Sequence, residues 1–448
     1  MPHGTMRALT VIWISALEPS LVLPAFAQSG PAARMEERPI HHQHGMDASG
    51  NLLGELGGLR PRLREEGVDL AAGYVSESAW NVRGGERERV RETGQFAVSA
   101  TIDTEKIAGL AGGTFRATVT YRRGVDLGAA AGLKVLQQVQ EVYGRGQTWR
   151  LTQFWYQHRF AGGHADLKVG RLTQGEDFAA FSCDLQNLSF CGSPPGNVAG
   201  DYWYNWPVSQ WGARLRVRND RFYAMAGAYE VNPRNLDNTF TIGYLHGAKG
   251  VLVPLEVGHT PRHGPKGLPG SYRIGAWYNT ATADDVGLDV NAQPRGVTGL
   301  APLRRKGRYG VYAQFQQQLT GSVNDGTDGP RTKRGLSAFL NVTQTDRRTT
   351  VTDNQVAAGA TYKGALELRP DDEVTIAIAR TNVNANALAS LAPGSPRPDA
   401  EYAAELAYCL HLVDWLTVRP NLQYVANPGG FKEARDVVIF GLKASLTL

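Results

Sequence analysis

Apolar and polar side chains alternate along most of this chain, and this period of two limits the fold more than any other feature of the sequence. In the segment 114–122, Phe115, Val119 and Tyr121 alternate with arginines and threonines. The same pattern recurs in four further segments, 214–218, 272–279, 309–316 and 401–412. Because successive side chains of a β-strand point to opposite faces, each segment predicts a strand with one apolar and one polar face. The chain is therefore predicted to be all-β.

The apolar faces indicate a membrane barrel rather than a soluble sandwich. Hydrophobic residues make up 42% of the chain, yet its mean hydropathy is -0.31, as expected where alternate residues face water. Aromatic residues lie near the ends of several apolar faces, and the last segment, 437–448, alternates up to the final residue. At about 25 residues for each strand with its connection, the sequence predicts a transmembrane antiparallel β-barrel of about 16 strands.

The first 27 residues are typical of a secretory signal peptide. A charged start at Arg7 is followed by an apolar stretch that ends in Ala25-Phe26-Ala27. Residues 28–51 are rich in Pro, Gly, Ser and charge and are predicted to be a flexible segment. This segment holds three close histidines, which fit a solvated tail better than a metal site: His41, His42 and His44.

The barrel is expected to occupy residues 52–448. Leucines at helical spacing in 52–66 predict a short amphipathic helix at its amino-terminal end, before the period changes to two.

Charge, cysteine content and motifs exclude several function classes. The formal net charge of +5 is too modest to indicate nucleic-acid binding. Three cysteines suit an exported protein with at most one disulfide; Cys183 and Cys191 could close a tight loop, whereas Cys409 is predicted to be a packed side chain. The chain contains no Gly-x-Ser-x-Gly, no His-Glu-x-x-His, no phosphate loop and no zinc-finger spacing, so no catalytic residue, metal or cofactor is predicted.

A set of short motifs resembles the carbohydrate-selective porins of the OprB type. The first is Gly-Asn-Leu-Leu-Gly-Glu-Leu-Gly-Gly-Leu-Arg at 50–60, and another is Tyr-Asn-Trp-Pro-Val-Ser-Gln-Trp-Gly at 204–212. The others, in the same order as in the family, are 153–157, 168–171, 183–191, 229–233, 268–272, 369–372 and 420–429. The resemblance implies a monomeric barrel of about sixteen strands in the outer membrane of a Gram-negative bacterium, surrounded by its lipid, that passes glucose and other small sugars by facilitated diffusion.

The phase of each strand then predicts which side chains face the pore. A sugar has hydroxyls on its rim and an apolar C–H face, so arginine forks and flat aromatic rings complement it, and binding must stay weak for flux to continue. The lumen-phase arginines are Arg116, Arg122, Arg159, Arg214, Arg216, Arg218 and Arg273. Glu405 falls on the lumen phase of its strand as a candidate acceptor, and three tryptophans are stacking candidates or, equally, packing residues: Trp203, Trp206 and Trp277.

A pore constriction requires a loop that folds into the barrel. The segment 175–207 is long enough, could be pinned by a disulfide between Cys183 and Cys191, and carries the polar candidates Asp184, Gln186 and Asn187.

Two other functions stay open at this stage. The excess of lumen-phase arginine favours a porin for small anions or sugar acids. A secreted β-rich glycan-binding protein or hydrolase would need its apolar faces buried in a core.

Overall fold

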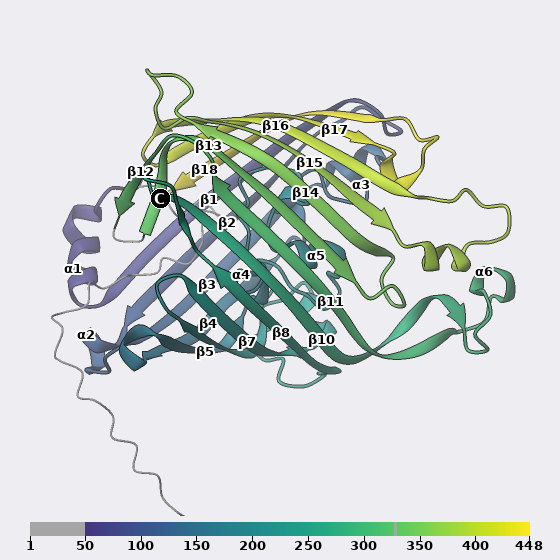
Figure 1. The fold of residues 1–448 in the computed structure, drawn as a ribbon, viewed down its shortest axis with the longest axis horizontal. Helices are drawn as coiled ribbons and strands as arrows, with labels where there is room; N and C mark the ends of the chain where they lie inside the picture. The colour runs from purple at the N-terminus through teal and green to yellow at the C-terminus, as the bar shows by residue number, and fades with distance from the viewer. Residues whose placement is uncertain (1–49, 327–328) are drawn as a thin grey trace, which may run out of the picture.

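A computed structural model of the protein describes residues 50–326 and 329–448, and there the alternating segments form a closed antiparallel β-barrel (Figure 1). Within the described residues sixteen strands build the wall, and β9 (Arg262–His263) and β12 (Ser322–Gly326) are short additions. The first eight wall strands are β1 Val68–Arg83, β2 Val90–Asp103, β3 Gly113–Gly124, β4 Trp149–Phe160, β5 Ala165–Leu172, β6 Gln210–Arg218, β7 Phe222–Val231 and β8 Gly250–His259. The other eight are β10 Leu268–Asp289, β11 Pro302–Gln318, β13 Gly329–Thr345, β14 Thr352–Lys363, β15 Glu373–Val383, β16 Ala400–Val413, β17 Leu416–Ala426 and β18 Val437–Thr447.

The barrel closes where the last strand meets the first. β18 pairs antiparallel with both β17 and β1, and the seam register places Trp80 opposite Phe440 and Tyr74 opposite Leu446. Every neighbouring pair of wall strands is antiparallel, so no strand edge is left for lipid to meet. The predicted terminal strand is confirmed as the strand that completes the wall.

The two faces of the wall follow the alternation in the sequence. Ile274, Leu406 and Phe440 are exposed on the outer face, whereas their sequence neighbours Arg273 and Glu405 are buried inside the barrel. Because lipid solvates apolar side chains as well as a protein core does, the outward apolar face is the stable arrangement in a membrane. A soluble sandwich would bury the residues that are exposed here. In the described part of the chain, no helix combines the length and the apolar character that a membrane crossing demands.

The amino-terminal helix is shorter than predicted. The sequence predicts a helix over 52–66, but the structure has a 3₁₀ turn, η1 (Leu56–Gly58), followed by α1 (Leu59–Glu65). Gly54, Gly57 and Gly58 adopt positive φ angles of 56°, 65° and 91°, a conformation that is not helical. The predicted leader and most of the predicted flexible segment fall in residues 1–49, outside the described residues.

Short connections lie at one end of the barrel and long loops at the other. Figure 1 shows α1, α2 (Thr104–Ala108) and the carboxyl end of the chain at one end, and α3 (Leu127–Ala131) and α6 (Arg295–Thr298) at the opposite end. In outer-membrane barrels short turns face the periplasm and long loops face the outside. The end that carries α1 is therefore the periplasmic end.

Two long loops continue inward rather than outward. The inner loop, residues 173–209 between β5 and β6, contains α4 (Gln174–Asp177), η4 (Leu188–Phe190) and α5 (Pro194–Val198), and Figure 1 shows α4 and α5 within the outline of the barrel. The cap loop, residues 125–148 between β3 and β4, contains α3 and η2 (Glu141–Tyr143). The remaining short 3₁₀ turns are η3 Ala161–Gly163, η5 Pro233–Leu236, η6 Ala385–Ser390 and η7 Pro428–Gly430.

The outward apolar face gives a direct test of the membrane orientation. We expect Leu406→Arg, at the middle of β16, to destabilise the barrel by about 2–4 kcal/mol, because a guanidinium would lie at the bilayer midplane. Leu412→Arg, near the periplasmic end of the same strand, is the matched control and should cost about 0–1 kcal/mol. Equilibrium unfolding in lipid bilayers measures both, and equal costs at the two positions would contradict this orientation.

Candidate functional site

The inner loop crosses the lumen and is held first by the wall at β8, β10 and β11. The amide of Ala179 donates to Glu256 Oε2 at 2.7 Å, and Gln314 Nε2 donates to the carbonyl oxygen of Ala179 at 3.2 Å. Arg273 Nη1 donates to the carbonyl oxygen of Ala180 at 2.8 Å. Arg273, predicted to line the pore, thus faces the lumen but is used to hold this loop.

The loop is held again on the other side of the lumen, at β16 and β17. Glu405 accepts from the amides of Gln186 at 2.9 Å and Asn187 at 2.8 Å. Asn187 Nδ2 donates to Gln423 Oε1 at 3.0 Å, and Asn421 Nδ2 donates to Gln186 Oε1 at 2.9 Å. Glu405 is an acceptor on the lumen face, as predicted, but its carboxylate is occupied by the loop backbone and not open to a sugar.

A disulfide and a buried lysine fix the middle of the inner loop. Cys183 and Cys191 are joined, and Lys443 Nζ donates to the carbonyl oxygen of Cys183 at 2.8 Å. The same ammonium lies 3.1 Å from carboxylate oxygens of both Glu77 and Glu141. A buried charge is tolerated when it is paired and hydrogen-bonded, so this cluster fixes the loop without a free charge. Cys409 is buried and outside any disulfide, as predicted.

The two loops are joined to each other above the lumen. The amide of Leu188 donates to the carbonyl oxygen of Gln138 at 2.8 Å, and the amide of Glu141 donates to that of Gln186 at 3.0 Å. Asp184, the third predicted constriction residue, is partly exposed and lies 3.7 Å from Arg419. The cap loop and the inner loop therefore form one hydrogen-bonded assembly inside the barrel.

A polar cavity of about 240 Å³ remains between these loops and the wall. Its lining includes charged groups of both signs, two asparagines and one indole: Arg122, Glu141, Arg145, Glu176, Asn197, Asn205 and Trp206. Arg122 Nε and Trp206 Nε1 both donate to Gln95 Oε1, at 2.8 and 2.9 Å. Arg122, which was predicted from strand phase, and Trp206, which was predicted from loop composition, thus bind the same side-chain amide, that of Gln95 on β2, beside this cavity.

The three tryptophans differ in their environments. Trp203 is 0% exposed and Trp277 is 3% exposed, with ring centroids 5.1 Å apart. Their indole N–H groups donate to Ser193 Oγ and to Tyr202 Oη, each at 3.0 Å. Neither ring has a face open to the lumen, so the prediction of sugar stacking does not fit Trp203 or Trp277 here, and the packing alternative does. Trp206 lines the cavity.

A charged wall lies below the inner loop, on β5 and β6. Arg214 pairs with Asp166 and lies 3.4 Å from Asp177, and Arg216 Nε lies 2.9 Å from Asp166 Oδ2. Lys168 Nζ lies 3.1 Å from Asp177 Oδ1. The wall therefore presents alternating charges with cations in excess.

The predicted arginines fall into two groups. Arg122, Arg214 and Arg273 are buried by loop contacts and ion pairs. The other four keep partial exposure on the lumen face toward the periplasmic end: Arg116, Arg159, Arg216 and Arg218. Strand register places Arg159 opposite Asp166, on the same face as the charged wall. All seven have the predicted phase, and whether they contact a sugar stays a prediction.

Two neighbouring carboxyls of α4 have pKa values shifted in opposite directions. Burial raises the pKa of Glu176 to about 7, although Lys168 and Gln153 act against this shift. Burial also acts to raise the pKa of Asp177, but attraction to Lys168 and Arg214 outweighs it and leaves that pKa below its usual value. Glu176 therefore changes charge near neutral pH, while Asp177 stays ionised.

The prediction from sequence missed several residues of this site. Glu77 and Lys443 lie on the lumen phase of β1 and β18, so the phase argument that found the arginines applies to them as well. Glu141 and Arg145 lie on the cap loop, where no period marks a facing direction. Glu176 is in a short helix whose position depends on the path of the inner loop.

Comparison with known proteins places this architecture in a family. The family described as "Carbohydrate-selective porin, OprB family" matches residues 87–448. This chain belongs to the OprB family of porins. It is similar to Porin B of Pseudomonas aeruginosa, with 43% identity covering 88% of this chain and 90% of that protein. It is also 32% identical to the putative porin QuiX of Acinetobacter baylyi, over 88% of this chain and 92% of that protein.

A solved OprB structure has the same architecture. The high-pH structure of Pseudomonas putida OprB matches with a TM-score of 0.83 and 39% identity, covering 91% of this chain and 99% of that one. The predicted family, the sixteen-stranded antiparallel barrel and the outer-membrane location are confirmed. The protein is an outer-membrane OprB porin, a channel whose family is selective for carbohydrates.

The anchoring of the inner loop at Glu405 predicts a change in channel behaviour. Glu405→Ala leaves the buried amides of Gln186 and Asn187 without an acceptor, at a cost of about 1–3 kcal/mol for each group. The loop should then fluctuate, and single-channel recordings should show increased current noise. Glu373→Ala, which removes a carboxylate 3.8 Å from Lys363, is the control and should leave the noise unchanged. Quiet currents from Glu405→Ala would contradict the anchoring role.

The raised pKa of Glu176 predicts a pH-dependent ion selectivity. Above about pH 7 the carboxylate adds a negative charge to the cavity, and below it the neutral acid leaves the nearby cations less balanced. Anion selectivity should therefore rise as the pH falls from 8 to 6, measured as a shift of reversal potential under a salt gradient. Glu176→Gln should abolish this pH step, and Asp184→Asn should retain it. A step that survives in Glu176→Gln would assign it to another group.

Proposed function

We propose that small sugars such as glucose diffuse through the cavity between the inner loop, the cap loop and β3. The observation that carries this proposal is the combination, in one 240 Å³ space inside the lumen, of an indole with charged and amide groups. The face of Trp206 suits the apolar C–H face of a sugar, and the polar groups suit its hydroxyls.

The proposed mode of transport is weak and repeated binding. A channel must release what it binds, so contacts of modest strength along the lumen serve flux better than one tight site. Four partly exposed arginines continue from the cavity toward the periplasmic end: Arg116, Arg159, Arg216 and Arg218. We propose that they offer successive hydrogen-bond donors to a sugar that has passed Trp206.

We also propose that one chain is the working unit. The wall, the inner loop and the cap loop that narrow the lumen all come from the same chain. A monomer therefore contains every element of the proposed path.

A second candidate, transport of small anions or sugar acids, is favoured by the charged wall. Lys168, Arg214 and Arg216 face Asp166 and Asp177 there, and Arg116, Arg159 and Arg218 add further positive charge. A fixed positive potential in a narrow pore raises the local concentration of anions. The two candidates predict different responses to a neutral and an acidic sugar.

Planar-bilayer conductance of the purified protein, titrated with glucose and then with gluconate, tests the proposal. We expect saturable block by glucose, and in Trp206→Ala a half-blocking concentration about five-fold higher, corresponding to about 1 kcal/mol of lost ring contact. Trp80→Ala, which removes an exposed ring from the outer face, is the control and should block like the unmodified protein.

The other outcomes separate the alternatives. Anion-selective channels that respond to gluconate and not to glucose would support the anion porin. Folded protein that forms no channels would contradict transport altogether.

A further inference from the structure

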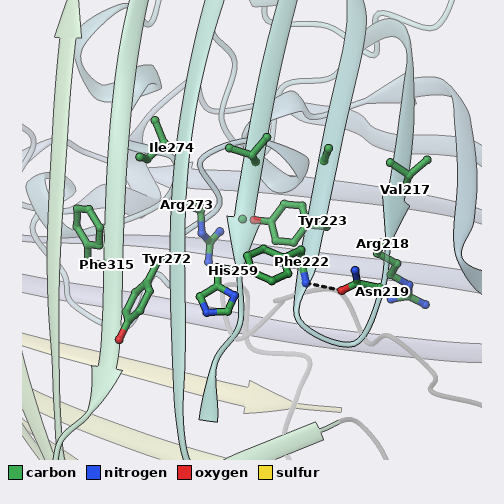
Figure 2. Close-up of a pocket in the computed structure, with 13 residues that line it drawn as sticks. Val217, Arg218, Asn219, Phe222, Tyr223, His259, Tyr272, Arg273, Ile274 and Phe315 are labelled. Atoms are coloured by element: carbon green, nitrogen blue, oxygen red, sulfur yellow. Dashed lines mark hydrogen bonds between the residues drawn. The ribbon is translucent and has the colours of Figure 1, made fainter. Parts of the chain in front are cut away.

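The outer face of the barrel has a groove that sugar transport does not use. It has a volume of about 590 Å³ and crosses β6, β7, β8, β10 and β11 near their periplasmic ends (Figure 2). Its walls are outward-facing apolar side chains: Val217, Phe222, Ala224, Val257, Ile274 and Phe315. These residues are on the opposite phase from the lumen residues, so the groove opens toward the membrane.

An aromatic row forms the periplasmic border of the groove. The rings of Phe222 and His259 stack with centroids 4.3 Å apart, and Tyr272 lies 6.3 Å from His259 and 6.0 Å from Phe315. Figure 2 shows these four side chains side by side across the strands, with Ile274 and Val217 farther from the turn. Such rings lie at the level of lipid headgroups, so acyl chains reach the groove and headgroups reach its border.

The small side chain of Ala224 forms the floor of the groove. Ala224 lies opposite Val257 in the register of β7 and β8, and the next pair is Tyr223 with Gly258. On the outer face the small side chain of Ala224 therefore leaves a depression between Phe222 and Ile274.

Positive charge is concentrated at the border of the groove. The turn 219–221 and the turn 260–267 are joined, since the amide of Thr260 donates to the carbonyl oxygen of Arg221 at 2.7 Å. These turns and the adjoining strand ends carry three cations, two histidines and one carboxylate: Arg221, Arg262, Lys266, His259, His263 and Asp220.

A nearby turn of the same rim has a different charge. The turn between β14 and β15 carries Glu367, Asp371 and Asp372 with one arginine, Arg369, which is paired to Asp372 at 2.9 Å. The turns of this rim therefore differ in charge, and those that border the groove are among the basic ones.

We propose that the groove docks one anionic phospholipid of the periplasmic leaflet, with an acyl chain along the apolar strip and the phosphate against the basic turns. The apolar lining and the basic border complement the two parts of this one molecule. The acyl chain of a phospholipid without net charge would also fill the strip, but its headgroup would gain no net electrostatic attraction from the basic turns. A second copy of this chain would bring the same basic border against itself around a C₂ axis, which is unfavourable.

Native mass spectrometry of the full chain in non-ionic detergent tests the proposal. The protein is titrated with phosphatidylglycerol and, separately, with phosphatidylcholine of the same acyl chains. We expect one phosphatidylglycerol adduct at concentrations at least about five-fold below those needed for phosphatidylcholine, as one basic contact would give. Arg221→Gln with Lys266→Gln should remove this preference, and Ala224→Phe should fill the strip and remove the adduct.

Two matched variants outside the groove are the controls, one on β16 and one at the outer end of the barrel. Ala404→Phe places the same ring on the outer face of β16, and Lys432→Gln removes a cation from the outer end; both should bind phosphatidylglycerol like the unmodified protein. Heat-modifiable migration on gels confirms that each variant is folded. If Ala224→Phe does not fold, the double variant Arg221→Gln with Lys266→Gln tests the proposal by itself.

Three results would overturn the proposal. Equal binding of the two lipids, unchanged in the variants, would mean annular lipid only. Dimers or trimers that Ala224→Phe dissociates would make the groove an interface between copies. Loss of the adduct on addition of inorganic phosphate, with no effect of Ala224→Phe, would mean a phosphate site without an acyl groove.

Discussion

The structure depends on the requirement that every backbone polar group in the hydrocarbon region has a partner within the protein. An isolated sheet cannot meet this requirement at its edges, so the wall must close, and β18 pairs with β1 to close it. A wall of sixteen strands is too wide for its own side chains to fill, which leaves a lumen. Selection among solutes then requires further polypeptide inside the lumen, and the inner loop and the cap loop provide it.

Buried ionic contacts fix those loops. Glu405 and Glu256 receive backbone amides from opposite parts of the inner loop, and Lys443 joins the loop carbonyls to Glu77 and Glu141. Each charge is placed where the low dielectric would otherwise disfavour it, so each needs its partner. The loop is consequently fixed at both sides of the lumen, and a fixed constriction can discriminate among solutes by size and polarity.

The sequence predicted the wall better than the site. Strand phase follows from local alternation, which is why Arg116, Arg214 and Arg273 all have the predicted facing direction. The roles of Glu405 and Trp203 depend on where the inner loop runs, and that path is set by contacts with residues more than 70 positions away, such as those of Ala179 with Glu256 and of Gln186 with Glu405. No period in the loop sequence encodes such contacts. The motif resemblance identified the family although it gave no physical reason for the path of the inner loop.

The central claim is that the inner and cap loops narrow this barrel to a path for small sugars. Liposome swelling, with the protein incorporated and sugars of increasing size outside, tests it most directly. The account predicts rapid entry of monosaccharides, a steep fall in rate for longer oligosaccharides, and a loss of that size limit when Glu405→Ala loosens the inner loop. Equal rates for short and long sugars in the unmodified protein, or no entry of monosaccharides, would contradict it.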